Sequence, residues 1–164
     1  MSGMQKKTEE KLQREFLSMP LHHIDTNVII EAIEETKSGE SCSDYLNRVG
    51  YKYRGTISLP VLGEFLLVTL REKKPVEDKE FDLRRLNAII NKSRIQLLSP
   101  LKSSYQTADK IMEIDTRIEP TDALNYSMAV QENADAFVSL DGKLILNATL
   151  ENAFGVAIKH PSQL

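Results

Sequence analysis

The feature that most constrains the fold is an alternation of short, continuous apolar runs with longer segments of helical periodicity. The apolar runs predict strands at 21–24, 56–59, 95–98, 136–140 and 155–158. Helical spacing predicts helices at 5–19, from 28 to a terminal Gly39, and at 43–53, 60–73, 78–92, 103–114 and 122–133, with a short helix before the last strand. Strands that are apolar without alternation are typical of a parallel sheet buried on both faces. We therefore expect an α/β fold, a central parallel β-sheet flanked by helices in a three-layer sandwich.

The length of the chain, 164 residues, fits one such domain. The first predicted helix stands apart, because Pro20 ends it before the first strand begins. Leu12, Phe16 and Leu17 form its narrow apolar stripe. We therefore expect residues 1–20 to be an N-terminal helical extension that packs on the body or on a partner, and residues 21–164 to be the main domain.

Composition and charge limit where the protein is expected to act and which classes of protein it can belong to. No apolar run has the length of a membrane span, so a soluble protein is expected. The single cysteine, Cys42, cannot form an internal disulfide, which favours a cytoplasmic location. It lies in a serine-rich segment expected to be a polar turn, where an incidental thiol is the simplest interpretation. The net charge of −3 argues against a protein that coats nucleic acid, but it does not exclude an enzyme with acids at its centre.

Four acidic residues occupy the places where a site is expected in such a sheet. Asp25 directly follows the first strand, Asp141 follows the strand at 136–140, Asp122 opens a helix, and Glu64 lies one turn into the helix that follows another strand. Because sites in open α/β sheets form beyond the carboxyl ends of the strands, we expect these acids to converge on one edge.

Each acid also has an ordinary structural interpretation. Asp25 and Asp122 are suited to cap helices, and Asp141 with Gly142 is a common turn dipeptide. Glu64 could face water, although its neighbours are almost all apolar. The adjacent Gly63 costs the helix about 1 kcal/mol, which a close approach of backbone or substrate would explain. The conjunction of four acids at one expected edge, more than any single acid, favours a functional site.

Carboxylates held close together repel one another, and a hard cation such as Mg²⁺ or Mn²⁺ relieves that repulsion through oxygen ligands. The sequence shows no Cys/His cluster typical of zinc, and His22 and His23 are interpreted as strand or interface residues. No set of residues suited to Ser–His–Asp chemistry is visible. The inventory therefore favours phosphodiester hydrolysis by metal-activated water.

The chain resembles the PIN-domain nucleases in four segments, which lie at 24–30, 60–65, 121–124 and 138–143. The resemblance implies that Asp25, Glu64, Asp122 and Asp141 bind Mg²⁺ or Mn²⁺. It also implies that Thr26 or Asn27, together with Ser139, orients the site through hydrogen bonds. Many members carry a second acid two residues after the last one and an aromatic residue next. Lys143 and Leu144 stand at those places here, which leaves the binding of a second metal ion open.

Small relatives of this kind resemble VapC-type toxins, which cleave RNA, commonly form homodimers and are silenced by an antitoxin protein. The resemblance implies a metal-dependent endoribonuclease with an RNA substrate. A catalytically silent interaction module is an alternative, supported by the acidic pI, the missing second acid and the extra helix. A structure-specific DNA nuclease is another, since the same acids would serve it. The basic residues on the amphipathic helices are interpreted as solvated and are not assigned to substrate.

Overall fold

The computed structural model describes residues 3–34, 36 and 39–164. In this part of the chain, five strands form one parallel sheet in the order β3-β2-β1-β4-β5. The strands are β1 (Leu21–Ile24), β2 (Arg54–Ser58), β3 (Gln96–Leu98), β4 (Ala136–Val138) and β5 (Ala157–Lys159). The first strand of the chain is therefore the central one, and it pairs with β2 on one side and β4 on the other. The predicted parallel α/β fold is confirmed.

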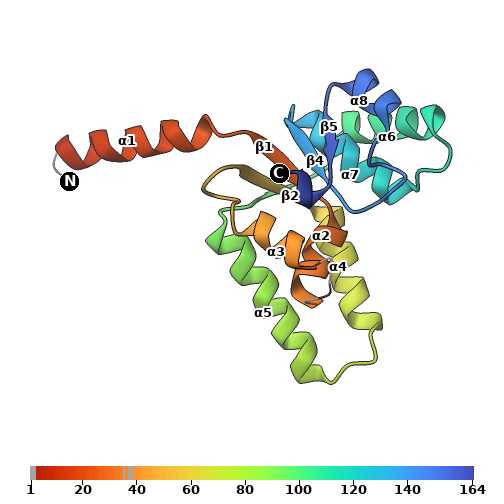
Figure 1. Ribbon diagram of the computed structural model, residues 1–164, viewed down its shortest axis with the longest axis horizontal. Coiled ribbons are helices and arrows are strands. Elements are labelled where there is room, and N and C mark those ends of the chain that lie inside the picture. Colours follow the sequence, from red (N-terminus) through yellow and green to blue (C-terminus); the bar gives the residue numbers. More distant parts are fainter. Residues whose placement is uncertain (1–2, 35, 37–38) are drawn as a thin grey trace.

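Helices connect the strands and cover both faces of the sheet (Figure 1). They are α1 (Gly3–Leu17), α2 (Thr26–Glu34), α3 (Gly39–Leu46), α4 (Leu59–Arg71), α5 (Val76–Lys92), α6 (Lys102–Ile114), α7 (Pro120–Gln131) and α8 (Ala148–Phe154), with a 3₁₀ turn at Pro161–Gln163. None of the helices described is long and apolar enough to cross a lipid bilayer.

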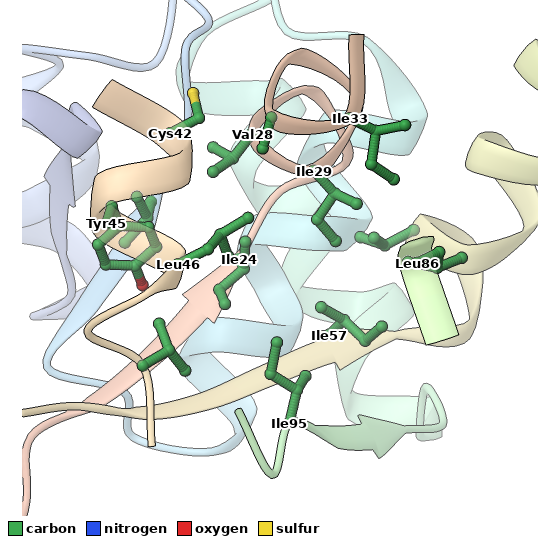
Figure 2. Close-up of a cluster of buried hydrophobic side chains, with 14 of the residues drawn as sticks. Ile24, Val28, Ile29, Ile33, Cys42, Tyr45, Leu46, Ile57, Leu86 and Ile95 are labelled. Carbon is green, nitrogen blue, oxygen red and sulfur yellow. The ribbon is translucent and has the colours of Figure 1, made fainter. Parts of the chain in front are cut away.

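Two hydrophobic cores lie on opposite faces of the sheet. One packs α2, α3, α4 and α5 against residues such as Ile24 and Ile57, as Figure 2 shows. The other packs α6, α7 and α8 against Phe137 and Ile158. Successive residues of β4 alternate between them, since Val138 belongs to the first core and Phe137 to the second. This alternation produces the expected three layers.

The predicted helix at 43–53 is wrong in its second half. Helix α3 begins at Gly39 and ends at Leu46, so Gly39 opens this helix and does not close the preceding one. Gly50 has φ +89°, a left-handed conformation that interrupts helical geometry and favours glycine. Cys42 lies on α3 and is fully buried in the first core, which contradicts the expected polar turn.

Two peripheral elements differ from the buried centre. Strand β3 lies at the edge of the sheet and exposes Gln96 and Leu97, so the expectation of strands buried on both faces fails there. Helix α1 projects from the rest of the molecule (Figure 1). The Phe16 ring lies 5.8 Å from the Arg94 guanidinium carbon, while Leu12 and Leu17 are exposed.

Candidate active site

Asp25 lies at the carboxyl end of the central strand and is 2% exposed. Its backbone N–H donates to the Val138 carbonyl at 2.9 Å, which continues the ladder to β4. The carboxylate Oδ1 accepts the backbone N–H of Thr26 at 2.8 Å. Its Oδ2 accepts the Ser139 hydroxyl at 2.7 Å and the Asn27 amide at 2.9 Å. Asp25 therefore bonds the first residue of α2 and not the second or third N–H that a capping side chain accepts, and it is also held from the loop after the neighbouring strand β4.

Asn27 and Ser139 tie the start of α2 to the loop after β4. The Asn27 Nδ2 also donates to Ser139 Oγ at 3.2 Å, and its Oδ1 accepts the Leu140 N–H at 3.0 Å. The Ser139 Oγ accepts the Asp141 N–H at 3.0 Å. The hydrogen-bonding capacity of the Ser139 hydroxyl is thus fully used, one bond donated and two accepted. These bonds fix Asp25 and the backbone of Asp141 in one unit.

Glu64 is partly buried on α4 and does not simply face water. Its Oε2 accepts the Thr26 hydroxyl at 2.7 Å, so Thr26 bonds the carboxylates of both Asp25 and Glu64. The expected reason for Gly63 is not found, because a Cβ at that position would meet no described atom within 4 Å. Gly63 instead leaves open space beside Glu64.

Asp122 lies in the first turn of α7, whose N-cap is Glu119, so Asp122 is not the cap of this helix. Burial, then the neighbouring carboxylates of Asp25, Asp141 and Glu64, raise its pKa to about 7. The pKa of Asp25 rises to about 6, mainly because of burial, although the bonds from Ser139 and Thr26 oppose the rise. The structure therefore brings all four predicted acids within electrostatic reach of one another.

Asp141 occupies a turn, as its Asp–Gly sequence predicts, and its Oδ1 accepts the Lys143 N–H at 2.9 Å. The side chain of Lys143 points toward α7 instead of supplying a second acid, and its Nζ lies 3.7 Å from a Glu119 oxygen. Asp141 thus combines an ordinary turn role with a position beside Asp25 and Asp122. The fourth acid is present, and the companion acid of many relatives is replaced by a cation.

The donor chemistry of this cluster fits a hard divalent cation, because it consists of carboxylate oxygens. As the described residues stand, no group of three or more His, Cys, Asp or Glu side chains is arranged so that it could hold a metal ion. Unneutralised carboxylates repel one another, and the raised pKa values of Asp25 and Asp122 reflect this together with burial. A cation would have to draw these side chains closer together.

The two histidines of β1 lie away from the acid cluster. His22 stacks on Tyr53 with ring centroids 4.2 Å apart, and its Nδ1 lies 3.1 Å from the Tyr45 hydroxyl. His23 is fully buried, with its Nδ1 2.9 Å from the Thr56 hydroxyl. Burial lowers both pKa values, to about 4 for His22 and about 3 for His23. Both are neutral strand residues, in agreement with the interpretation from sequence.

Two polar residues at the site were missed from sequence. Asn125 and Ser58 are both fully buried. The Asn125 Nδ2 donates to Asp25 Oδ1 at 3.4 Å, and its Oδ1 accepts the Ser58 hydroxyl at 3.0 Å. Ser58 in turn accepts the Val61 N–H at 3.2 Å and so caps α4. The usable signal was spacing, because Asn125 follows Asp122 by three residues and such pairs share one side of a helix.

Comparison with known proteins agrees with this arrangement. The family model described as PIN domain matches residues 23–148, which include all four acids. No curated protein matches the sequence. Solved structures show the same fold at low sequence identity.

VapBC2 from Rickettsia felis, bound to a promoter DNA fragment, has a TM-score of 0.62 at 20% identity, covering 85% of this chain and 98% of the other. FitAcB from Neisseria gonorrhoeae has a TM-score of 0.64 at 18% identity, covering 87% and 99%. VapC20 from Mycobacterium tuberculosis, a toxin that cleaves the sarcin–ricin loop, has a TM-score of 0.55 at 14% identity, covering 74% and 90%.

Proposed function

The chain belongs to the PIN-domain family, and on that premise we propose that it is an endoribonuclease that hydrolyses RNA phosphodiester bonds with Mg²⁺ or Mn²⁺. One observation carries the proposal. Four carboxylates from different segments meet at the carboxyl edge of the sheet, and two of them have pKa values raised toward neutrality. Such an arrangement is costly unless a cation compensates it, and shifts of this kind are typical of functional sites.

In this proposal Asp25, Glu64, Asp122 and Asp141 hold the ion. When bound, the ion supplies a nucleophilic water and neutralises the scissile phosphate. Thr26 orients the Glu64 carboxylate through its 2.7 Å bond. Asn27 and Ser139 orient the Asp25 carboxylate through their bonds to its Oδ2. The partly exposed acids on α4, α7 and the loop after β4 leave the site open to a strand of RNA.

The similar structures also bear on the partners of the chain. The similar structures include a toxin–antitoxin complex from Klebsiella pneumoniae, with a TM-score of 0.59 at 11% identity, and the toxin VapC20. This supports the proposal that the chain is the toxin of a toxin–antitoxin pair. We further propose that it acts in the cytoplasm as a homodimer bound by an antitoxin protein. Residues 21–164 then form the nuclease domain, and residues 1–20 form an appended helix.

The test is cleavage of a mixed RNA pool with and without Mn²⁺. We expect cleavage that requires Mn²⁺, is stopped by EDTA and is lost in Asp122→Asn. The exposed Asp109 on α6 provides the matched control Asp109→Asn, which should cleave normally. Cleavage that is unaffected by EDTA, or full activity of Asp122→Asn, would contradict the proposal.

The same experiment separates the alternatives. Parallel digestions of single-stranded RNA, hairpin RNA and DNA distinguish a ribonuclease from a structure-specific DNA nuclease. The catalytically silent module draws support from Lys143, which stands where many relatives carry an acid. It predicts neither Mn²⁺ binding in a titration nor cleavage of any of these substrates.

A further inference from the structure

Asn125 is an unexpected residue for its position in α7. Its side chain is fully buried, and the neighbouring buried positions of this helix include Ala123, Tyr126 and Met128. Asparagine has a low propensity for helix interiors, and burying its amide lowers stability unless the amide is hydrogen-bonded. An apolar residue would satisfy the packing of this helix, so the amide must contribute through the bonds that it makes.

Those bonds join three segments of the chain. The Asn125 amide donates to Asp25 at the end of β1, and its carbonyl accepts the hydroxyl of Ser58 at the end of β2. Ser58 also accepts the Val61 N–H, and this bond fixes the start of α4. Because α7 carries Asp122 and α4 carries Glu64, one side chain connects the supports of three of the four acids.

The other donors to Asp25 do not reach α7, although Thr26 also bonds Glu64 on α4 through its hydroxyl. They are Thr26 and Asn27 at the start of α2 and Ser139 after β4. Among the residues that the structure describes, Asn125 is the only side chain of α4 or α7 that bonds Asp25. This bond is the longest of the four, at 3.4 Å, and bonds of this kind in ligand-free sites commonly shorten in the productive complex.

We propose that Asn125 is a positioning residue that, with Ser58, sets the distance of Asp25 from the helices carrying Asp122 and Glu64, and thereby the affinity of the acid cluster for a divalent cation. The inference rests on the proposed function, since it concerns the ion that those acids would hold. Asn125 itself does not ligate the ion. It acts through Asp25 on one side and through the capped start of α4 on the other.

The test compares Asn125→Leu and Ser58→Ala with the wild-type protein. Leucine has the same branched arrangement of side-chain heavy atoms as asparagine and makes neither hydrogen bond. Ser58→Ala keeps the bond from Asn125 to Asp25 and removes the link from Asn125 to α4 together with the Ser58 cap of that helix. The control is Asn87→Leu, at an exposed position on α5. Mn²⁺ affinity is measured by isothermal titration calorimetry at a temperature where circular dichroism shows each variant to be folded, and melting is recorded without metal.

We expect the Kd for Mn²⁺ to rise about tenfold in Asn125→Leu and by a smaller factor in Ser58→Ala, as is typical of residues that orient metal ligands. The control should keep the wild-type Kd. In cleavage assays kcat should fall while KM for RNA stays constant. A purely structural role predicts a lower melting temperature with an unchanged Kd, and that result would overturn the proposal.

The failures are distinguishable. A wild-type protein that bound no Mn²⁺ would overturn the proposed function itself, and the role of Asn125 with it. Wild-type binding with an unchanged Kd in the variants would overturn only the role of Asn125. If Asn125→Leu does not fold, the Kd of Ser58→Ala decides alone, and an unchanged value would count against the proposal.

Discussion

The hydroxyl of Thr26 donates to the carboxylate of Glu64 at 2.7 Å, and this bond joins the start of α2 to the second turn of α4. Thr26 is nearly fully buried, whereas Glu64 is only partly buried. The backbone N–H of Thr26 donates to the Asp25 carboxylate at the same time. One residue therefore sets the relative orientation of two of the proposed metal-binding carboxylates.

Replacing Thr26 with valine keeps the shape of the side chain and removes the donor. We expect Thr26→Val to weaken Mn²⁺ binding and to lower kcat, each by about tenfold, because an outer partner of a ligand orients it. The measurements are calorimetric Mn²⁺ titration and RNA cleavage. Thr26→Ser keeps the hydroxyl and should stay near wild type. A loss in Thr26→Ser without a loss in Thr26→Val would show that the methyl group, not the hydrogen bond, matters.

Asp122→Asn should abolish cleavage but stabilise the metal-free protein. The pKa of Asp122 is raised to about 7 by burial and by its acidic neighbours. The folded wild-type protein favours the protonated Asp122. This contribution to the free energy of unfolding is complete below about pH 4 and is lost as the pH rises through about 7. At pH 8 the variant should therefore gain about 1–2 kcal/mol, after allowance for solvent screening at a partly exposed site.

Urea unfolding at pH 8 and at pH 3.5 measures this effect. The gain should disappear at the lower pH, where Asp122 is protonated in both states of the wild-type protein. Added Mn²⁺ should also reduce the gain, because an ion that binds only the folded wild-type site stabilises it. Destabilisation of Asp122→Asn at pH 8 would show that the carboxylate has partners that compensate its charge.

The buried His23 predicts a loss of stability in mild acid. Burial lowers its pKa to about 3, so the folded protein keeps it neutral while the unfolded chain takes up a proton below pH 6.5. The stability is complete above pH 6.5 and falls by about 1.4 kcal/mol per pH unit as the pH decreases toward the folded pKa. His22, with a pKa of about 4, adds to the loss over a narrower range.

The comparison of wild type with His23→Gln between pH 6.5 and 4.5 isolates this contribution. Asp25 and Asp122 act in the opposite direction over part of this range, but they act equally in both proteins. The free energy of unfolding of His23→Gln should therefore depend less steeply on pH. Parallel pH dependences would mean that His23 gains a proton in the folded protein or does not titrate in the unfolded chain.

The presence of Lys143 in place of a second acid leads us to expect that the chain binds a single metal ion. The Lys143 side chain stands where many relatives place a second acid, and its Nζ is 3.7 Å from Glu119. We expect one Mn²⁺ per wild-type chain and an additional, weaker site in Lys143→Asp, because the substitution removes a cation and adds a ligand. Calorimetric stoichiometry checks this. Two ions per wild-type chain would show that the missing acid is not needed.

The sequence predicted the sheet well, because its strands are apolar runs that need no knowledge of distant contacts. Prediction failed where tertiary contacts or a single backbone angle decide the structure, as at Gly50 and at Cys42, whose polar neighbours concealed its burial on α3. The four acids could be placed at one edge because parallel strands end together. Asn125 could not be recognised as part of their support, because its partners Ser58 and Asp25 are distant in sequence.

The strand order also determines when the site can form during synthesis. The central strand β1 is the first strand to leave the ribosome, but Asp25 at its end is held by Ser139, which follows β4 and lies 114 residues later. A nascent chain that ends before Ser139 therefore lacks Asp141 and one wall of the Asp25 pocket. Under the proposed function, a chain that the ribosome has not yet extended past Asp141 therefore cannot cleave RNA.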